Sequence, residues 1–203
     1  MRKLVLLLIV GLLILGVASA VYAKDGSERP GRIAIKAGAF IPVSDEAKIL
    51  STGVAAEVTY TFYKTEKVDV NGIFGYFRTE MDDAAFPTTG LSAHLNNYYF
   101  MGGVDIYPKK EGFYVGVAGG GVVNDIHPQP DKIASNLDNT ITTWAFKVHT
   151  GYTAKNGVLI EGGLFTQGSD KLTTTLNTIK KATVPTITGH PNTGIYIMGG
   201  YKF

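Results

Sequence analysis

The chain of 203 residues contains no cysteine and, beyond its first 23 residues, no run of eighteen or more apolar residues. The missing cysteines exclude disulfide bonds as a source of stability. The missing apolar runs exclude a membrane-spanning helix from the rest of the chain, because such a helix needs about twenty apolar residues. Insertion of that part into a membrane would require a closed β-barrel, in which every backbone hydrogen bond is satisfied within lipid.

Excess charge is also missing. The chain has 19 basic and 17 acidic residues, and its first 23 residues contain two of the basic ones, Arg2 and Lys3, and no acid. The remainder is therefore formally neutral. Such a chain lacks the basic patch that nucleic-acid binding requires, so we expect no nucleic-acid partner.

The N-terminal segment has the pattern of a secretory signal peptide. Arg2 and Lys3 precede an uncharged apolar stretch, 4–17, and small residues follow it at 18–20 and 21–23. A basic start, a short apolar stretch and a small-residue cleavage site are typical of an export signal. We expect residues 1–23 to be this signal, with cleavage after Ala23 or, as a second choice, after Ala20.

After the signal, apolar and polar residues alternate with a period of two, which indicates β-strands with two different faces. In 53–63, for example, Val54, Val58 and Phe62 lie opposite Glu57 and Thr59. The eight expected strands are 31–41, 53–63, 68–79, 96–107, 112–123, 141–153, 158–167 and 194–203.

The connections between these segments alternate in length. The short ones are 64–67, 108–111 and 154–157, and the long ones are 42–52, 80–95, 124–140 and 168–193. Short turns at one end and long loops at the other are the pattern of outer-membrane barrels. The sequence predicts that residues 24–203 form one all-β domain: a transmembrane antiparallel up-and-down β-barrel of eight strands, with short periplasmic turns and long extracellular loops. The alternative is a secreted sandwich or soluble barrel that buries the apolar face.

The two faces of the predicted strands carry different candidate residues. The apolar face ends in Tyr201 and Phe203, which we interpret as an assembly signal at the carboxy-terminus. The polar face would place four charges of each sign in the lumen, where buried charges need partners. We expect Lys36 and Glu57 to pair, and a lower cluster to form from Arg32, Asp69, Asp105, Glu161 and Lys202. The predicted luminal network consists of Arg32, Lys36, Glu57, Asp69, Asp105, Lys147, Glu161 and Lys202.

The export signal, the segment 38–42, the eight alternating segments and the ending Gly200-Tyr201-Lys202-Phe203 resemble the small outer-membrane barrel superfamily. This superfamily includes the OmpA transmembrane domain, OmpX, OmpW and the opacity proteins. The resemblance implies location in the bacterial outer membrane, insertion by the outer-membrane assembly machinery, and contact with membrane lipid and lipopolysaccharide. Because the superfamily contains adhesins, pores, structural proteins and enzymes, the fold alone does not give the function.

We expect a monomer with a non-catalytic surface, structural or adhesin-like role, its lumen plugged by paired charges and its long loops open to a host or surface ligand. A narrow pore for small or hydrophobic solutes is the alternative. A lipid A-modifying enzyme is a more distant one, for which Ser92 and His94 are the candidates, in the reverse of the order expected for a deacylase. We expect no catalytic, cofactor-binding or metal site.

Overall fold

The computed structural model describes residues 31–43, 50–80, 92–109, 112–129, 140–168 and 193–203. The predicted signal peptide and its cleavage site lie outside these residues. So do His190 and the segment 169–192, for which the sequence suggests an exposed hairpin.

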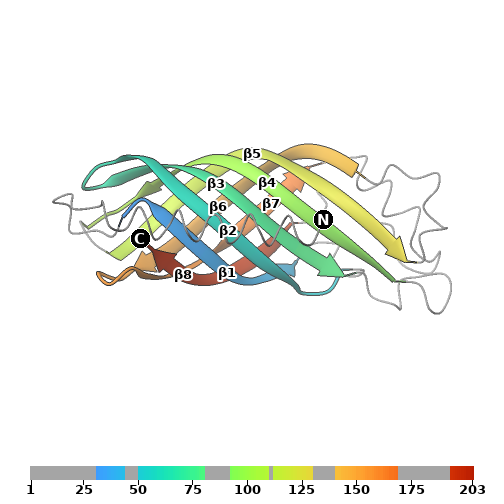
Figure 1. Ribbon diagram of the computed structural model, residues 1–203. Helices are drawn as coiled ribbons and strands as arrows, with labels where there is room; N and C mark the ends of the chain where they lie inside the picture. Colours follow the sequence, from blue (N-terminus) through green and yellow to red (C-terminus); the bar gives the residue numbers. More distant parts are fainter. Residues whose placement is uncertain (1–30, 44–49, 81–91, 110–111, 130–139, 169–192) are drawn as a thin grey trace.

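Eight strands form a closed antiparallel barrel in which each strand pairs with its neighbours in the sequence and β8 pairs with β1 (Figure 1). The strands are β1 (Ile33–Pro42), β2 (Gly53–Lys64), β3 (Val68–Glu80), β4 (Ser92–Ile106), β5 (Gly112–Gln129), β6 (Thr140–Thr153), β7 (Val158–Gly168) and β8 (Gly194–Lys202). This order is the predicted up-and-down topology.

The predicted strand positions are correct to within two residues except at two ends. β4 begins at Ser92 instead of residue 96, and β5 continues to Gln129 instead of residue 123. These two extensions pair with each other, His94 lying opposite His127. The sequence predicts both histidines in long connections, 80–95 and 124–140. This prediction is wrong, because the ladder between β4 and β5 continues past the alternating segments.

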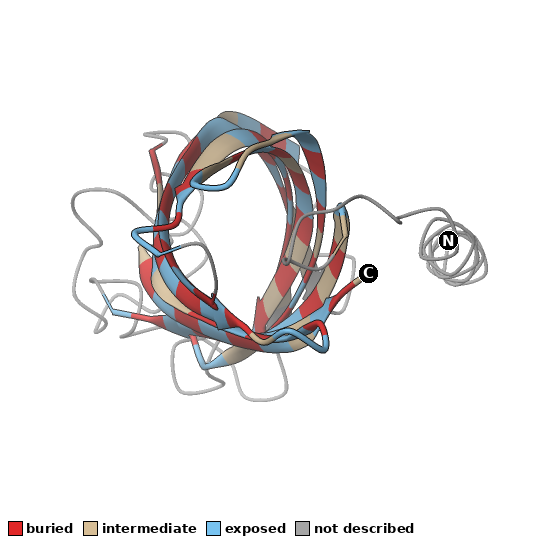
Figure 2. Ribbon diagram, turned by 90° about the vertical axis from the view of Figure 1, so that its left-hand side faces the viewer, coloured by how far each residue is buried: buried red, intermediate tan, exposed pale blue. Residues whose placement is uncertain are grey.

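Side chains alternate between the interior and the exterior of the barrel, as the buried and exposed bands along the strands show (Figure 2). On β6, for example, Lys147 is buried while its neighbours Phe146 and Val148 are exposed. The exposed face is rich in large apolar side chains on all eight strands. An apolar exterior around a polar interior is the reverse of a soluble protein, and it identifies a transmembrane barrel.

Aromatic side chains gather on this exterior near the short turns. They include Tyr60, Phe62, Tyr63, Phe113, Tyr152 and Tyr201, and each is at least two fifths exposed. A β-bulge between Thr61 and Tyr63 places Phe62 and Tyr63 on the outer face together. Tyr98 and Trp144 are exposed toward the other end. This is the arrangement of two interfacial girdles.

The barrel closes where β8 meets β1 and the turn between β6 and β7. The amide of Phe203 donates to the carbonyl of Ile33 at 2.8 Å, and the amide of Lys202 donates to Gly157 at 2.8 Å. Gly157 has a φ of 90°, which glycine adopts without strain, so the Asn156-Gly157 pair forms the predicted tight turn. Among the residues that the structure describes, none lies in a helix long and apolar enough to cross a membrane.

Candidate functional site

Four charged side chains meet inside the barrel and form what we call the charged ring: Lys36 on β1, Glu57 on β2, Lys147 on β6 and Glu161 on β7. Lys36 contacts the carboxylate of Glu57 and lies 2.9 Å from that of Glu161. Lys147 Nζ lies 2.6 Å from Glu57 and 2.8 Å from Glu161. Each lysine thus bridges both carboxylates, all four groups are buried, and the ring is neutral as a unit.

Three buried tyrosines donate hydrogen bonds to the same carboxylates. Tyr99 donates to Glu57 at 2.9 Å, and Tyr114 and Tyr196 donate to Glu161 at 2.7 and 3.1 Å. The ring of Tyr196 also lies under Lys147, with the ammonium 4.6 Å from its centroid. These hydroxyl groups replace the water that a carboxylate loses on burial, which is the condition under which buried charges are tolerated.

Glycines on intervening strands allow these long contacts. Gly151 lies in register between Tyr114 and Glu161, and a Cβ atom there would lie 2.5 Å from the Tyr114 hydroxyl. Gly75 occupies the same place between Glu57 and Tyr99. Because glycine has no side chain, the flanking residues can reach across its strand and meet.

A second luminal network lies toward the short-turn end. Lys202 Nζ lies 2.9 Å from Asp69. Beside this pair, the amide of Asn71 donates to one oxygen of Asp105 at 2.7 Å, and His149 Nε2 lies 2.7 Å from the other oxygen. Gly116 separates Asp105 from His149 in the register, so this contact also crosses a glycine.

Toward the long-connection end the lumen becomes apolar. Phe40 lies four residues beyond Lys36 on β1, and Phe165 lies four beyond Glu161 on β7. Phe40 stacks on Phe77 with 4.2 Å between ring centroids, and Phe165 packs edge-on against Phe77 at 5.1 Å. All three rings are buried. The charged ring is thus covered by an aromatic layer, Phe40, Phe77 and Phe165.

Above the aromatic layer lie three buried amide side chains. Gln167 donates to Asn97 at 3.2 Å and to Asn124 at 2.9 Å, and Asn124 donates to the carbonyl of Ile141 at 3.1 Å. The lumen therefore changes along its axis from a charged lower network, through the charged ring and the aromatic layer, to neutral amides.

The structure brings together most of the residues that the sequence predicts for the lumen, in a different grouping. Lys36 and Glu57 are in contact, as expected. Glu161 belongs to the charged ring, so its assignment to the lower cluster is wrong. It lies only three residues from Val158 at the short-turn end of β7, but its carboxylate contacts Lys36 and Lys147. Arg32 is exposed just before β1 begins, so its assignment to the interior is also wrong.

The role of the three tyrosines, Tyr99, Tyr114 and Tyr196, is not predicted from the sequence. A signal was present, because each is the inward neighbour of an outward apolar residue in an alternating strand. An aromatic side chain at an inward position is expected only to fill the lumen. The pairing register of neighbouring strands shows that it lies against a carboxylate, and this register cannot be read from one strand alone.

The candidate histidine of the enzyme alternative lies on the outer face of the β4 extension. His94 stacks on His127, with ring centroids 5.0 Å apart, and His127 Nε2 lies 2.6 Å from Asp125. Burial, together with the guanidinium of Arg78 and the neighbouring ring of His127, lowers the pKa of His94 from its ordinary value. Among the described residues, no group of three or more histidine, aspartate or glutamate side chains is placed to hold a metal ion.

Comparison with known proteins finds likeness in structure and not in sequence. No protein-family model and no curated protein matches the chain. The crystal structure of the outer-membrane protein OprG from Pseudomonas aeruginosa is similar over 88% of this chain and 99% of its own, with 13% identity and a TM-score of 0.51. The crystal structure of Ail, the attachment invasion locus protein of Yersinia pestis, is similar over 85% of this chain and 97% of its own, with 13% identity and a TM-score of 0.47. At this level of identity the likeness to OprG shows the fold alone, and it agrees with the closed eight-stranded transmembrane β-barrel described above.

Proposed function

We propose that this protein is an integral barrel of the bacterial outer membrane with a closed lumen and a non-catalytic surface or structural role. The observation that carries this proposal is the packing of the interior, where charged, aromatic and amide layers follow one another along the axis. An eight-stranded barrel is only wide enough to be filled by side chains.

The charged ring is the strongest argument for closure. An open, wet pore would leave its lysines and carboxylates hydrated and separated, whereas here Lys147 contacts Glu57 and Glu161 directly. An ion entering from the short-turn end would have to displace these pairs and then pass the buried ring of Phe77. Both steps cost free energy. The first leaves buried charges without their partners, and the second moves a charge through an apolar layer.

Export and assembly complete the proposal. Residues 1–23 serve as the cleaved signal, and Tyr201 and Phe203 form the carboxy-terminal signal for the assembly machinery. Their side chains pack edge to face with 4.9 Å between ring centroids, on the outer face beside the closing seam. Deletion of Phe203 is expected to reduce the amount of heat-modifiable barrel in the outer-membrane fraction, while an unchanged amount would contradict this role.

Any ligand or adhesion partner would be met at the end where the long connections join the strands. The unequal strand lengths support this, because β4 with 15 residues and β5 with 18 extend furthest toward that end (Figure 1). The outer face there carries Glu80 at the end of β3, His94 on β4 and Asp125 on β5 in place of the apolar residues found along the wall. We propose that this polar extension stands above the membrane, beside lipopolysaccharide, as part of the surface that faces the exterior.

Conductance and uptake measurements test the closed lumen against the pore alternative. The purified barrel is placed in planar bilayers and in vesicles loaded for solute uptake, with a porin reconstituted in the same way as a positive control. We expect no stable conductance and no uptake. Steady conductance at neutral pH, or uptake of a small hydrophobic solute above that of empty vesicles, would favour the pore.

Mass spectrometry of lipid A tests the enzyme alternative separately. Cells with and without the protein should yield identical lipid A profiles. Loss or gain of an acyl chain that depends on His94 would instead establish catalysis.

A further inference from the structure

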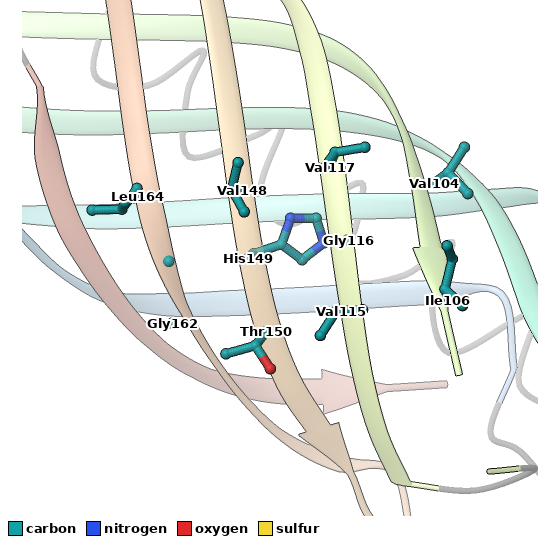
Figure 3. A pocket seen from close by; sticks show the side chains of 11 residues that line it. Val104, Ile106, Val115, Gly116, Val117, Val148, His149, Thr150, Gly162 and Leu164 are labelled. Carbon is teal, nitrogen blue, oxygen red and sulfur yellow. The ribbon is translucent and has the colours of Figure 1, made fainter. Parts of the chain in front are cut away.

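The outer wall of the barrel has a groove of about 430 Å³ across β4, β5, β6 and β7 (Figure 3). It follows two neighbouring rows of directly paired residues. One row is Val104, Val117, Val148 and Leu164, and the other is Ile106, Val115, Thr150 and Gly162. These outward residues are small or medium in size, and Gly162 contributes no side chain at all.

Bulkier residues bound the groove at both ends. Phe113 and Tyr152 are paired in the next row toward the short turns, and Phe146 projects from β6 on the opposite side. All three are about half exposed on the outer face. The groove therefore forms where smaller side chains lie between larger ones. It extends from the aromatic girdle at the short-turn end to the middle of the wall.

Two polar side chains line the groove, Thr150 and His149. Thr150 donates its hydroxyl to the carbonyl of Tyr114 at 3.0 Å. The His149 imidazole is buried behind the groove: its Nε2 lies 2.7 Å from Asp105 in the lumen, and its Nδ1 has no hydrogen-bond partner but is itself buried. An occupant would find only hydrocarbon, which excludes a headgroup, a sugar and a charged peptide.

We propose that this groove binds one acyl chain of a glycerophospholipid from the periplasmic leaflet. Its volume is in the range of small-ligand sites, and its walls continue the lipid-facing surface without a break. Its position just above the periplasmic girdle puts it within reach of chains whose headgroups lie at that girdle. A second copy of the barrel fits less well, because a convex wall cannot enter a concave groove while a flexible chain can.

Gly162 and Gly102 provide a matched pair of variants. A Cβ at Gly162 would lie no closer than 3.4 Å to any neighbour, and one at Gly102 would meet nothing within 4 Å. Both positions are on the outer face of a strand, so Gly162→Ile and Gly102→Ile are both compatible with the fold. Only the first fills the groove. Val148→Phe fills it from β6 and serves as a second test should Gly162→Ile fold poorly.

The experiment is native mass spectrometry of the barrel after reconstitution in vesicles of palmitoyl-oleoyl phosphatidylethanolamine and phosphatidylglycerol and gentle extraction into detergent. We expect one retained phospholipid on the wild type and on Gly102→Ile. For Gly162→Ile and Val148→Phe we expect the ratio of lipid-bound to free protein to fall about tenfold, which corresponds to about 1.4 kcal/mol.

Several outcomes would overturn the proposal: no retained phospholipid on the wild type, equal retention in all four proteins, or a dimer that Gly162→Ile abolishes. The inference rests on the membrane location proposed above. Heat-modifiable migration of the same samples tests that location independently, so a folded barrel without bound lipid would refute the groove and leave the membrane barrel intact.

Discussion

The two faces of each strand are built by different rules, and β6 shows this over two adjacent residues. Lys147 points inward and contacts the carboxylates of Glu57 and Glu161, while Val148 points outward and lines an apolar wall. The inner face requires particular partners at particular distances, because its polar groups are cut off from water. The outer face requires only an apolar surface, because lipid adapts its shape to whatever it covers. Substitutions should therefore be severe or mild according to the face and to the kind of change.

The largest effect is expected from Lys147→Met. This change leaves Glu57 and Glu161 to share the single cation Lys36, so the charged ring gains a net negative charge while still buried. Removing one partner of a buried pair typically costs about 3–5 kcal/mol. Urea unfolding in vesicles should show a loss of that size. The double variant with Glu57→Gln restores neutrality and should lose less than the two single changes added together, whereas strict additivity would mean that the ring is not a unit.

A charge on the outer face should come next. Val148→Arg places a cation against the lipid in the middle of the wall, at a cost of about 2–4 kcal/mol for a midplane position. Tyr152→Arg on the same strand lies at the short-turn girdle and should cost about 0–1 kcal/mol, since depth sets the penalty. Equal losses from the two variants in the same urea assay would contradict the placement of the membrane.

Strand number, order and the direction of each face are predictable from the sequence, because they depend on local alternation and on turn residues such as Asn156-Gly157. The pairing of Lys36 with Glu57 is also predictable, since they lie on consecutive strands joined by one connection. The partners of Glu161 are not, because Tyr114 reaches it across Gly151 on β6, and Lys36 reaches it from β1 through the tilt of the barrel. That tilt is a property of the closed sheet and leaves no mark on any single strand.

The ends of β4 and β5 show the other limit. Beyond Val123 the outer face carries Asp125 and His127 and the apolar Ile126 points inward, so the pattern of outward apolar residues stops near Val123 while the backbone ladder continues to Gln129. The sequence therefore predicts where the strands leave the lipid better than where they end.

An inward glycine should matter less than a buried charge and more than an outward glycine. Gly151→Ala introduces a Cβ 2.5 Å from the hydroxyl of Tyr114 and 2.7 Å from the carbonyl oxygen of Ile160, so the tyrosine must move and lose its hydrogen bond to Glu161, and the backbone of β7 must shift. Hydrogen bonds to charged groups contribute about 1.5–3 kcal/mol. At Gly119, on the outer face, the nearest atoms to a Cβ lie 3.8 Å away. Gly119→Ala should therefore leave the unfolding midpoint unchanged or raise it, and a loss equal to that of Gly151→Ala would show that backbone flexibility, not the Tyr114 contact, decides the cost.

The smallest effect is expected from removing one methyl group, and it separates the faces most directly because the chemistry is identical. Ile73 is buried in the lumen, at 2% exposure, and Ile197 is on the outer wall, at 53%. Ile73→Val should cost about 0.5–1.5 kcal/mol, because neighbouring side chains relax only partly around the space that is left. Ile197→Val should cost less, because a lipid chain moves into the same space and restores the lost contacts. If the two variants unfold at different urea concentrations in this order, the interior is packed as a solid core. If they unfold at the same urea concentration, the interior fills the lost space as readily as lipid does. A lumen packed so loosely would not remain closed to solutes.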